Sequence, residues 1–366
     1  MKIFHFILGK AAKDRANGVN QVVAGLAKYS IKAGNQVRVI GKAQTAACEG
    51  EVIAHDGFNV IVFTKWSRAL HKAVVEAVKW ADVVHLHGTY APHNIWLGRL
   101  CEKHNKPYVI TLHGGLSSAR KTRRNWLRKT VFHLLLQKRN LSRASLIHCL
   151  TEEESTDLYN QARPTQAAVI PNGVDRDDFP SPSPLKPHKR PIRIGYIGRL
   201  SREKNLHALC SAFHAINKDK EMKLLLAGPK SLEGNEILRN WPNAGISLVG
   251  PKFGNEKRAF LEEIDLFVQP SKTDVFSIAA MEVLACGKPM VITRTSDASH
   301  FYDSKAFIMC EPTAYGIEKG LNKALSSKKH WPEMASRGRQ LIDQRMNWDA
   351  AAKDLIQAYE RITKDT

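Results

Sequence analysis

Two carboxylates that flank the predicted start of a helix carry the strongest chemical signal in the chain. A buried strand is predicted to end at Gln269 and a helix to begin near Ser277, with Asp274 before that start and Glu282 inside the helix. The first backbone N–H groups of a helix have no partner within it and can bind an anion. The two acids could accept hydrogen bonds from sugar hydroxyls, although the same pattern also fits an ordinary helix with one dipole-stabilising acid and one solvated acid.

A second candidate site follows another predicted strand that ends at Gly198. Arg199 and Lys204 lie five residues apart on the loop that leads to a helix starting near Asn205. Arginine can bind a diphosphate as a planar fork and lysine as a point charge. Because the glycines do not extend to the six-residue dinucleotide fingerprint, the sequence gives little support to a hydride-transfer cofactor.

The elements that must position these residues follow one pattern repeated twice. Short apolar runs alternate with helical stretches, which indicates a parallel sheet covered on both faces. The predicted strands are 3–8, 36–40, 60–64, 83–87, 108–113, 146–150 and 167–171, then 192–197, 223–227, 246–249, 266–269, 289–293 and 307–310. The predicted helices include 19–33, 69–80, 93–105, 205–217, 256–263 and 278–286. We therefore predict an α/β protein with a first domain at 1–180, a Pro-rich linker at 181–191 and a second domain at 192–346, with a ligand cleft between the domains.

The motifs on these elements resemble those of the GT-B fold, retaining glycosyltransferases of family 4 (glycosyltransferase group 1), and the resemblance covers nearly the whole chain. Its carriers are the Gly198-Arg199 loop with Lys204-Asn205, and the pair Asp274 and Glu282 followed by Gly287-Lys288-Pro289. Further matches in the family's order are Asp82-Val-Val-His-Leu-His87, Thr111-Leu-His113-Gly114-Gly115, Ile170-Pro-Asn172-Gly173-Val174-Asp175 and the closing helix at 347–366, which in the family crosses back to the first domain.

The resemblance implies two Rossmann-like domains and a role for each matching residue. Catalysis would rest on His113, Arg199, Lys204 and Asp274. The nucleotide-sugar donor would contact Gly18, Arg199, Lys204, Asp274, Phe276, Ser277, Ile278 and Glu282, with both ribose hydroxyls on Glu282. The acceptor, a saccharide or a lipid-linked saccharide of polysaccharide or lipopolysaccharide synthesis, would contact Asn17 and His87. The anomeric configuration would be retained without a metal or other cofactor, and we expect Arg199 and Glu282 to face the cleft rather than the core.

The segment that begins at Asp274 departs from the family pattern. The first acid is Asp274 where glutamate is commoner, and Val275-Phe276-Ser277 stands where Gly-Phe-Gly is usual. Aspartate keeps the carboxylate and shortens its reach by one methylene, so the change bears on the donor sugar rather than on the reaction type. A sugar-binding module without catalysis is a further alternative that the substitution leaves open.

Two motifs that resemble metal sites are given structural roles. Asp175 and Asp177 follow a Pro-Asn-Gly-Val turn, where acids commonly cap or solvate the turn. His85 and His87 share one face of a strand, but no third ligand has a suitable spacing, so we expect His85 to be a hydrogen-bonded structural histidine.

Charge and cysteine usage limit the class of protein and its partners. The formal net charge is +20, which predicts an anionic partner. The alternatives to a transferase are a nucleotide-sugar epimerase of the same fold and a non-catalytic basic nucleic-acid-binding protein, but nucleic-acid-binding motifs are missing from the sequence. The six cysteines are scattered, which is typical of reduced thiols in a cytoplasmic protein.

A basic segment at Arg120–Arg143 predicts contact with a membrane. It holds nine basic residues and no acid, interleaved with apolar side chains. A helix with a basic and an apolar face can lie at the surface of an anionic leaflet, which predicts a peripheral protein at the inner face of the membrane. The alternative is a helix that packs on the sheet with a solvated basic side, and we expect 132–136 to lie largely in the core.

Overall fold

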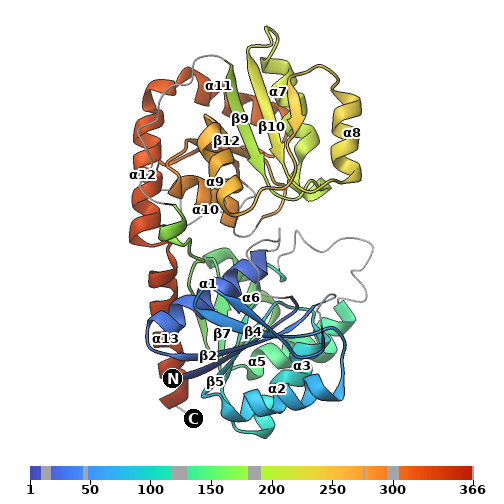
Figure 1. The fold of residues 1–366 in the computed structure, drawn as a ribbon, viewed down its shortest axis with the longest axis vertical. Coiled ribbons are helices and arrows are strands. Elements are labelled where there is room, and N and C mark those ends of the chain that lie inside the picture. Colours follow the sequence, from blue (N-terminus) through green and yellow to red (C-terminus); the bar gives the residue numbers. More distant parts are fainter. Residues whose placement is uncertain are drawn as a thin grey trace. The chain divides into compact units, whose positions relative to one another are not determined.

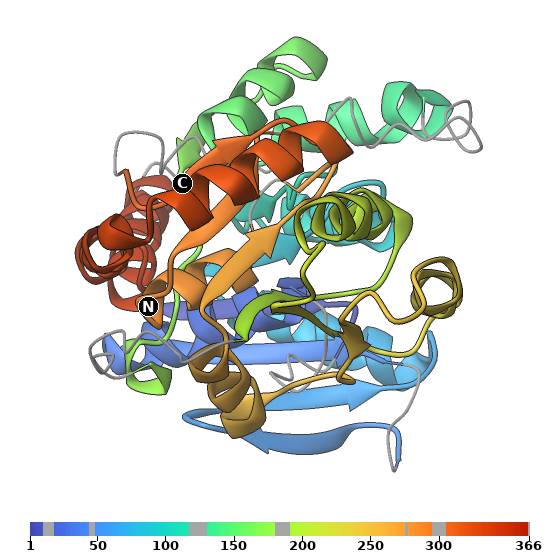
Figure 2. The same cartoon turned by 90° about the horizontal axis from the view of Figure 1, so that it is seen from above.

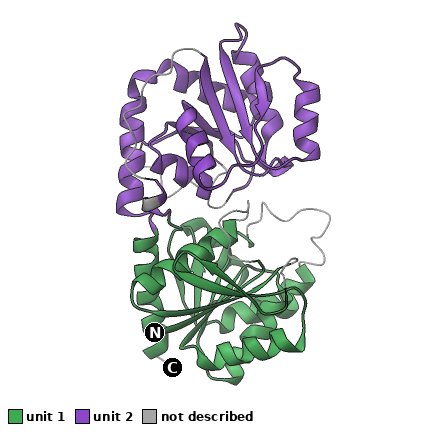
Figure 3. Ribbon diagram, in the orientation of Figure 1, with its two compact units in different colours: residues 1–173, 348–366 green, residues 174–347 purple. Residues whose placement is uncertain are grey.

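The computed structural model describes residues 1–9, 18–43, 48–116, 130–179, 191–274, 277–294 and 305–364. The chain forms two compact units, one of Met1–Gly173 with Trp348–Thr366 and one of Val174–Asn347 (Figure 3). The first unit ends at Gly173, ahead of the boundary predicted at residue 180, because Val174 forms a β-bridge with Asn347 and Phe179 packs in the core of the second unit. Nearly all of the predicted linker lies outside the described residues.

The first unit is built on an eight-stranded sheet with the order β3-β4-β2-β1-β5-β6-β7-β8. Its strands are β1 (Lys2–Ile7), β2 (Gln36–Lys42), β3 (Glu51–His55), β4 (Phe58–Phe63), β5 (Val83–His87), β6 (Tyr108–Thr111), β7 (Leu146–Cys149) and β8 (Ala167–Val169). Its helices are α1 (Gly18–Lys32), α2 (Arg68–Trp80), α3 (Pro92–Lys103), the π-helix η2 (His133–Gln137), α5 (Lys138–Arg143), α6 (Glu152–Gln161) and α13 (Trp348–Lys364). Neighbouring strands pair in parallel, except that β3, a strand absent from the predicted set, runs antiparallel to β4.

Alternate residues of each strand point to opposite faces of this sheet. Val84 and Leu86 of β5 pack in the large core that also contains residues of α2 and α6. His85 and His87 point to the other face, where α1 and α13 lie. At Gly25 of α1 an added Cβ would lie 2.2 Å from the ring of Trp348, so glycine is what lets α13 pack closely on α1.

The second unit is built on a six-stranded parallel sheet with the order β11-β10-β9-β12-β13-β14. Its strands are β9 (Ile192–Ile197), β10 (Met222–Ala227), β11 (Ile246–Leu248), β12 (Leu266–Gln269), β13 (Met290–Thr293) and β14 (Ile308–Cys310). Its helices are the 3-10 turns η3 (Arg176–Asp178), η4 (Arg202–Lys204) and η6 (Lys328–His330), with α7 (Leu206–Ile216), α8 (Leu232–Asn240), α9 (Gly254–Glu263), α10 (Ile278–Ala285), α11 (Ala314–Ser326) and α12 (Trp331–Gln344).

Helices cover both faces of this second sheet (Figures 1 and 2). Leu224 and Leu226 of β10 pack in the cluster formed with α7 and α11, whereas Leu225 and Ala227 pack in the cluster formed with α9, α10 and α12. A continuous apolar strand is therefore explained by burial on two sides. The prediction of two α/β, Rossmann-like sheets is confirmed.

In each sheet the strand order reverses once, and ligands bind open α/β sheets beside this reversal, at the carboxyl ends of the strands. The reversal lies between β1 and β5 in the first unit and between β9 and β12 in the second. Among the described residues, no helix combines the length and apolarity that crossing a membrane requires.

Candidate functional site

Lys204 and Asp274 meet at the strand-order reversal of the second unit. Lys204 follows β9, Asp274 follows β12, and the Lys204 Nζ lies 2.6 Å from Asp274 Oδ2. Both side chains are largely buried, and the same carboxylate oxygen accepts hydrogen bonds from Gln269 Nε2 at 2.9 Å and Ser271 Oγ at 3.3 Å. The structure thus joins two predicted site residues that are far apart in the sequence, and it adds Gln269 and Ser271 as supports.

Arg199 lies on the same loop as Lys204 but stays exposed. Gly198 has a φ of +153°, and a Cβ there would lie 2.6 Å from the hydroxyl of Tyr196, so the turn after β9 requires glycine. The Tyr196 hydroxyl donates to the carbonyl oxygen of Arg199 at 2.9 Å and fixes the backbone of the loop. The side chain of Arg199 is 59% exposed, 3.5 Å from Glu203, which leaves its guanidinium accessible to an anionic ligand.

Helix α10 begins four residues after Asp274. The Ser277 hydroxyl caps it by accepting a hydrogen bond from Ala280 N at 3.2 Å, and the helix starts at Ile278 as predicted. The remaining first-turn N–H groups carry the positive end of the helix dipole. Ser277 and Ile278 were predicted to contact the donor together with Phe276, and Phe276 lies outside the described residues.

Glu282 of α10 differs from the expectation that it faces an open cleft. Its carboxylate is buried and lies 2.5 Å from Nζ of Lys257, which belongs to α9 and is also largely buried. Because both partners are withdrawn from water, each charge compensates the other. The carboxylate therefore has a structural role in addition to any contact with a ligand. Sequence reasoning missed Lys257 because nothing in its spacing marks it.

In the first unit, His113 lies two residues after the end of β6, in a left-handed conformation with φ +52°. A residue other than glycine rarely adopts this conformation, and such strain concentrates at functional sites. The next residue, Gly114, donates its N–H to a carboxylate oxygen of Glu154, and the other oxygen accepts from Leu150 N at 2.7 Å. Buried Glu154 thereby holds the loop that carries His113, a support that the sequence did not reveal.

Of the remaining predicted contacts of the first unit, Gly18 and His87 lie on α1 and β5. Gly18 is exposed at the start of α1, and Asn17 lies outside the described residues. His87, at the end of β5, is buried, and its two ring nitrogens face His5 and His113. The assigned roles of these residues in donor and acceptor binding stay predictions.

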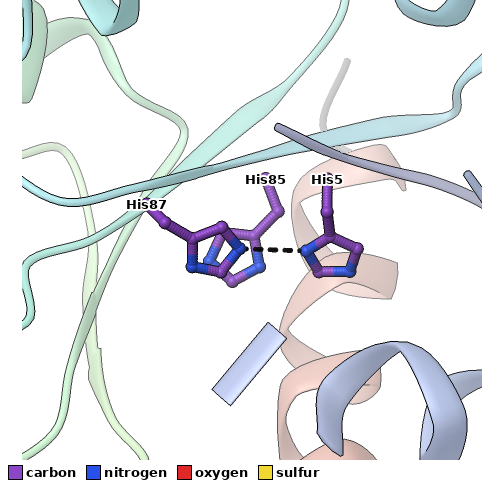
Figure 4. A group of neighbouring side chains, drawn as sticks. All are labelled: His5, His85 and His87. Atoms are coloured by element: carbon purple, nitrogen blue, oxygen red, sulfur yellow. Dashed lines mark hydrogen bonds between the residues drawn. The ribbon is translucent and has the colours of Figure 1, made fainter. Parts of the chain in front are cut away.

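Three histidines come together on the covered face of the first sheet. His5 of β1 pairs in register with His85 of β5, and each of His5, His85 and His87 offers a nitrogen within 4.8 Å of the others (Figure 4). The sequence did not identify His5 as a partner, because it lies on a different strand. His85 has hydroxyl partners at both nitrogens, Tyr359 and Thr111, each at 2.6 Å, in agreement with the prediction of a hydrogen-bonded structural histidine.

Two family models match the chain, one over most of the first sheet and one over the second sheet. Residues 16–178 match the model for Glycosyltransferase Family 4, and residues 191–326 match the model for Glycosyl transferases group 1. Both are models of sugar transfer, which favours the transferase over the epimerase and nucleic-acid-binding alternatives.

Individual proteins agree with these models. One subunit of the human phosphatidylinositol N-acetylglucosaminyltransferase is 26% identical over 218 residues, which are 58% of this chain but only 45% of the human protein. The GDP-mannose:cellobiosyl-diphosphopolyprenol alpha-mannosyltransferase of Xanthomonas oryzae pv. oryzae is 26% identical over 302 residues, 78% of this chain and 77% of that protein. The structure of sucrose-phosphate synthase from Thermosynechococcus elongatus has the same fold, with a TM-score of 0.83 over 100% of both chains at 18% identity. Because two glycosyltransferase models together match most of the chain and a solved sucrose-phosphate synthase shares its fold, the chain belongs to the GT-B fold glycosyltransferases of family 4, glycosyltransferase group 1.

Proposed function

We propose that this protein is a metal-independent, retaining glycosyltransferase that moves a sugar from a nucleotide-diphosphate sugar to a saccharide on a lipid carrier. The observation that carries the proposal is the arrangement at the reversal of the second sheet. There the accessible guanidinium of Arg199, the Lys204–Asp274 pair and the capped start of α10 occupy the ends of two neighbouring strands.

This arrangement suits the charge that develops during sugar transfer. As the bond between the anomeric carbon and the phosphate oxygen breaks, negative charge builds on the departing diphosphate. Cations and helix N–H groups that are already in place stabilise such charge without reorganisation. Arg199 and Lys204 supply the cations, and the first turn of α10 supplies the N–H groups.

The surroundings of Asp274 favour a front-face displacement over a covalent glycosyl intermediate. Its Oδ2 already accepts from three donors, so this oxygen is committed to hydrogen bonding rather than to nucleophilic attack. The acceptor hydroxyl would instead attack the anomeric carbon on the face that the diphosphate leaves. A phosphate oxygen of the leaving group takes the hydroxyl proton, which balances the step and retains the configuration.

The acceptor class is inferred from the relatives. One is named for transfer to a cellobiosyl-diphosphopolyprenol and another for transfer to phosphatidylinositol, and both of these acceptors carry lipid. Synthesis of a surface polysaccharide or lipopolysaccharide on a lipid carrier is the corresponding pathway class.

Donor binding is expected to raise thermal stability in the absence of metal. A ligand that binds only the folded state stabilises it by mass action, by about 2.7 kcal/mol at a hundredfold excess over Kd. We expect one member of a panel of UDP-, GDP- and ADP-sugars to raise Tm in the presence of EDTA. A donor effect or a turnover that appears only after Mn²⁺ or Mg²⁺ is added would contradict the metal-free mechanism.

The exposed part of the basic segment supports docking on an anionic membrane. The expectation that 132–136 lie largely in the core is wrong, because none of these five residues is buried and Leu134 and Leu135 are 63% and 69% exposed. Lys138 and Arg139 are exposed one helical turn further along the chain. Apolar side chains next to cations suit a membrane interface, where each basic group contributes about 1 kcal/mol. Arg143 forms an ion pair with Glu102, and the six basic residues of 120–129 lie outside the described residues.

We expect the protein to co-sediment with anionic vesicles more than with neutral ones. Changing Leu134 and Leu135 to Ser, or Lys138 and Arg139 to Ser, should lower the fraction bound to vesicles that contain phosphatidylglycerol. Leu232→Ser is the matched control, because this exposed leucine lies on α8 in the other unit. Equal binding of all variants to both kinds of vesicle would remove the membrane proposal and leave the transferase proposal in place.

A further inference from the structure

A chain of hydrogen bonds runs across the covered face of the first sheet, and its direction follows from one end. His148 Nε2 lies 2.8 Å from the carbonyl oxygen of Ile170, and a carbonyl can only accept, so Nε2 carries the proton. Burial lowers the pKa of His148 to about 4, so its other nitrogen, Nδ1, bears a lone pair and accepts from the Thr111 hydroxyl at 2.8 Å.

The same reasoning fixes the next links. The single hydroxyl proton of Thr111 is used, so Thr111 Oγ1 must accept from His85 Nε2–H. Burial also lowers the pKa of His85, so this imidazole is neutral, and its Nδ1 accepts from the Tyr359 hydroxyl, which burial keeps protonated by raising the pKa of the phenol. Every polar atom of His85 is therefore engaged, and its only lone pair points at Tyr359. This commitment to hydrogen bonds makes His85 a poor metal ligand despite its neighbours His5 and His87.

A second, separate chain joins the buried interior to the candidate catalytic histidine. His5 Nδ1 lies 3.1 Å from His87 Nε2, and His87 Nδ1 lies 3.2 Å from His113 Nε2. His5 and His87 are buried, and burial lowers the pKa of each, to about 3 for His5, so both rings are neutral. A neutral ring has one N–H and one lone pair, so the two hydrogen bonds must point in the same direction along the chain.

The surroundings of His5, at the inner end of this chain of hydrogen bonds, determine the direction. His5 Nε2 is buried, and none of the residues that the structure describes forms a hydrogen bond with it. If this hydrogen-bond chain pointed inward, His5 Nε2 would carry a buried N–H without a partner, which costs the desolvation of that donor, whereas an unpaired acceptor is better tolerated. The chain therefore points outward: His5 Nδ1–H donates to His87, and His87 Nδ1–H donates to His113 Nε2.

We infer that His5 and His87 are positioning residues that hold His113 in the tautomer with its proton on Nδ1. The importance of His113 in this inference rests on the proposed function. His87 then orients His113 through a hydrogen bond, instead of contacting the acceptor as predicted from the sequence. A ring held in this way can offer an N–H donor to an oxygen of the sugar while its Nε2 stays occupied. It cannot reverse its tautomer without creating the unpaired N–H at His5.

Nitrogen-15 NMR of the imidazole rings tests the tautomer directly and needs no activity. In the intact protein labelled on histidine, the His113 signals, identified by their loss in His113→Gln, should show a protonated Nδ1 and an unprotonated Nε2. His5→Leu removes the donor that polarises the chain, so His113 should shift toward the Nε2–H tautomer. His5→Asn keeps an N–H donor near the position of Nδ1 and should restore the wild-type pattern. A wild-type His113 protonated on Nε2, or a His113 unchanged by His5→Leu, would overturn the inference.

A matched control and an activity measurement separate this inference from the proposed function. Tyr359→Phe removes a buried hydroxyl from the neighbouring chain and should leave the His113 tautomer unchanged. In the transfer assay, His5→Leu should lower kcat about tenfold or more, since a misplaced imidazole tautomer impairs catalysis, and His5→Asn should recover it. If no donor supports transfer but the tautomer responds as stated, the proposed function fails and the positioning chain stands.

Discussion

Replacing Arg199 by alanine is expected to lower kcat for sugar transfer about a hundredfold, the usual cost of removing one group that stabilises charge in a transition state. The guanidinium is accessible and belongs to a loop whose backbone is fixed independently by Gly198 and Tyr196. Its ion pair with Glu203 is exposed and contributes little to folding. We therefore expect an unchanged Tm together with a large loss of turnover under donor saturation.

The same loop provides the matched control. Arg202 carries the same charge and is 89% exposed, at 3.9 Å from Glu233. Arg202→Ala removes one positive charge from the same loop region and should leave kcat within about twofold of wild type, since exposed charges contribute little at a distance. Equal losses in both variants would show that general charge matters rather than the position of Arg199, and near-normal turnover of Arg199→Ala would refute the site assignment.

Glu282→Ala is expected to destabilise the fold as well as weaken donor binding. Removing one partner of a buried ion pair leaves the other charge uncompensated and costs about 3–5 kcal/mol. Here the stranded charge is that of Lys257, whose side chain is 14% exposed. Urea denaturation should show this loss as a lower midpoint with an unchanged slope, in contrast to Arg199→Ala.

A double variant separates the structural role of Glu282 from its predicted contact with the ribose. Glu282→Leu with Lys257→Met replaces the pair by apolar side chains of similar size, a change that is often neutral or stabilising for a buried pair. Stability should recover while the Tm shift caused by the preferred nucleotide-sugar stays weak. If the donor shift returned together with stability, Glu282 would be a structural residue only.

The two-sheet architecture could be predicted from the sequence because the relevant signals are local. Leu224, Leu225 and Leu226 form a continuous apolar run, which requires burial on both faces of a strand and hence a covered parallel sheet. Once the strands were placed in order, Lys204 and Asp274 had to lie at the carboxyl ends of their strands. Their approach to 2.6 Å follows from the adjacency of β9 and β12, which the order of strands along the chain does not specify.

Contacts between residues with no fixed spacing, by contrast, exist only once the chain has folded. Lys257 reaches Glu282 from a different helix, and His5 meets His87 because β1 and β5 are neighbours in the sheet. An apolar run such as 132–136 has the same composition whether it faces the core or a membrane, so its partial exposure was not predictable. Hydrophobic periodicity indicates which side chains lie on the same face of a helix or strand. What that face packs against depends on elements that are distant in the sequence. The direction of the His5–His87–His113 chain depends in addition on one unpaired buried nitrogen, a property that no single residue has until its neighbours are in place.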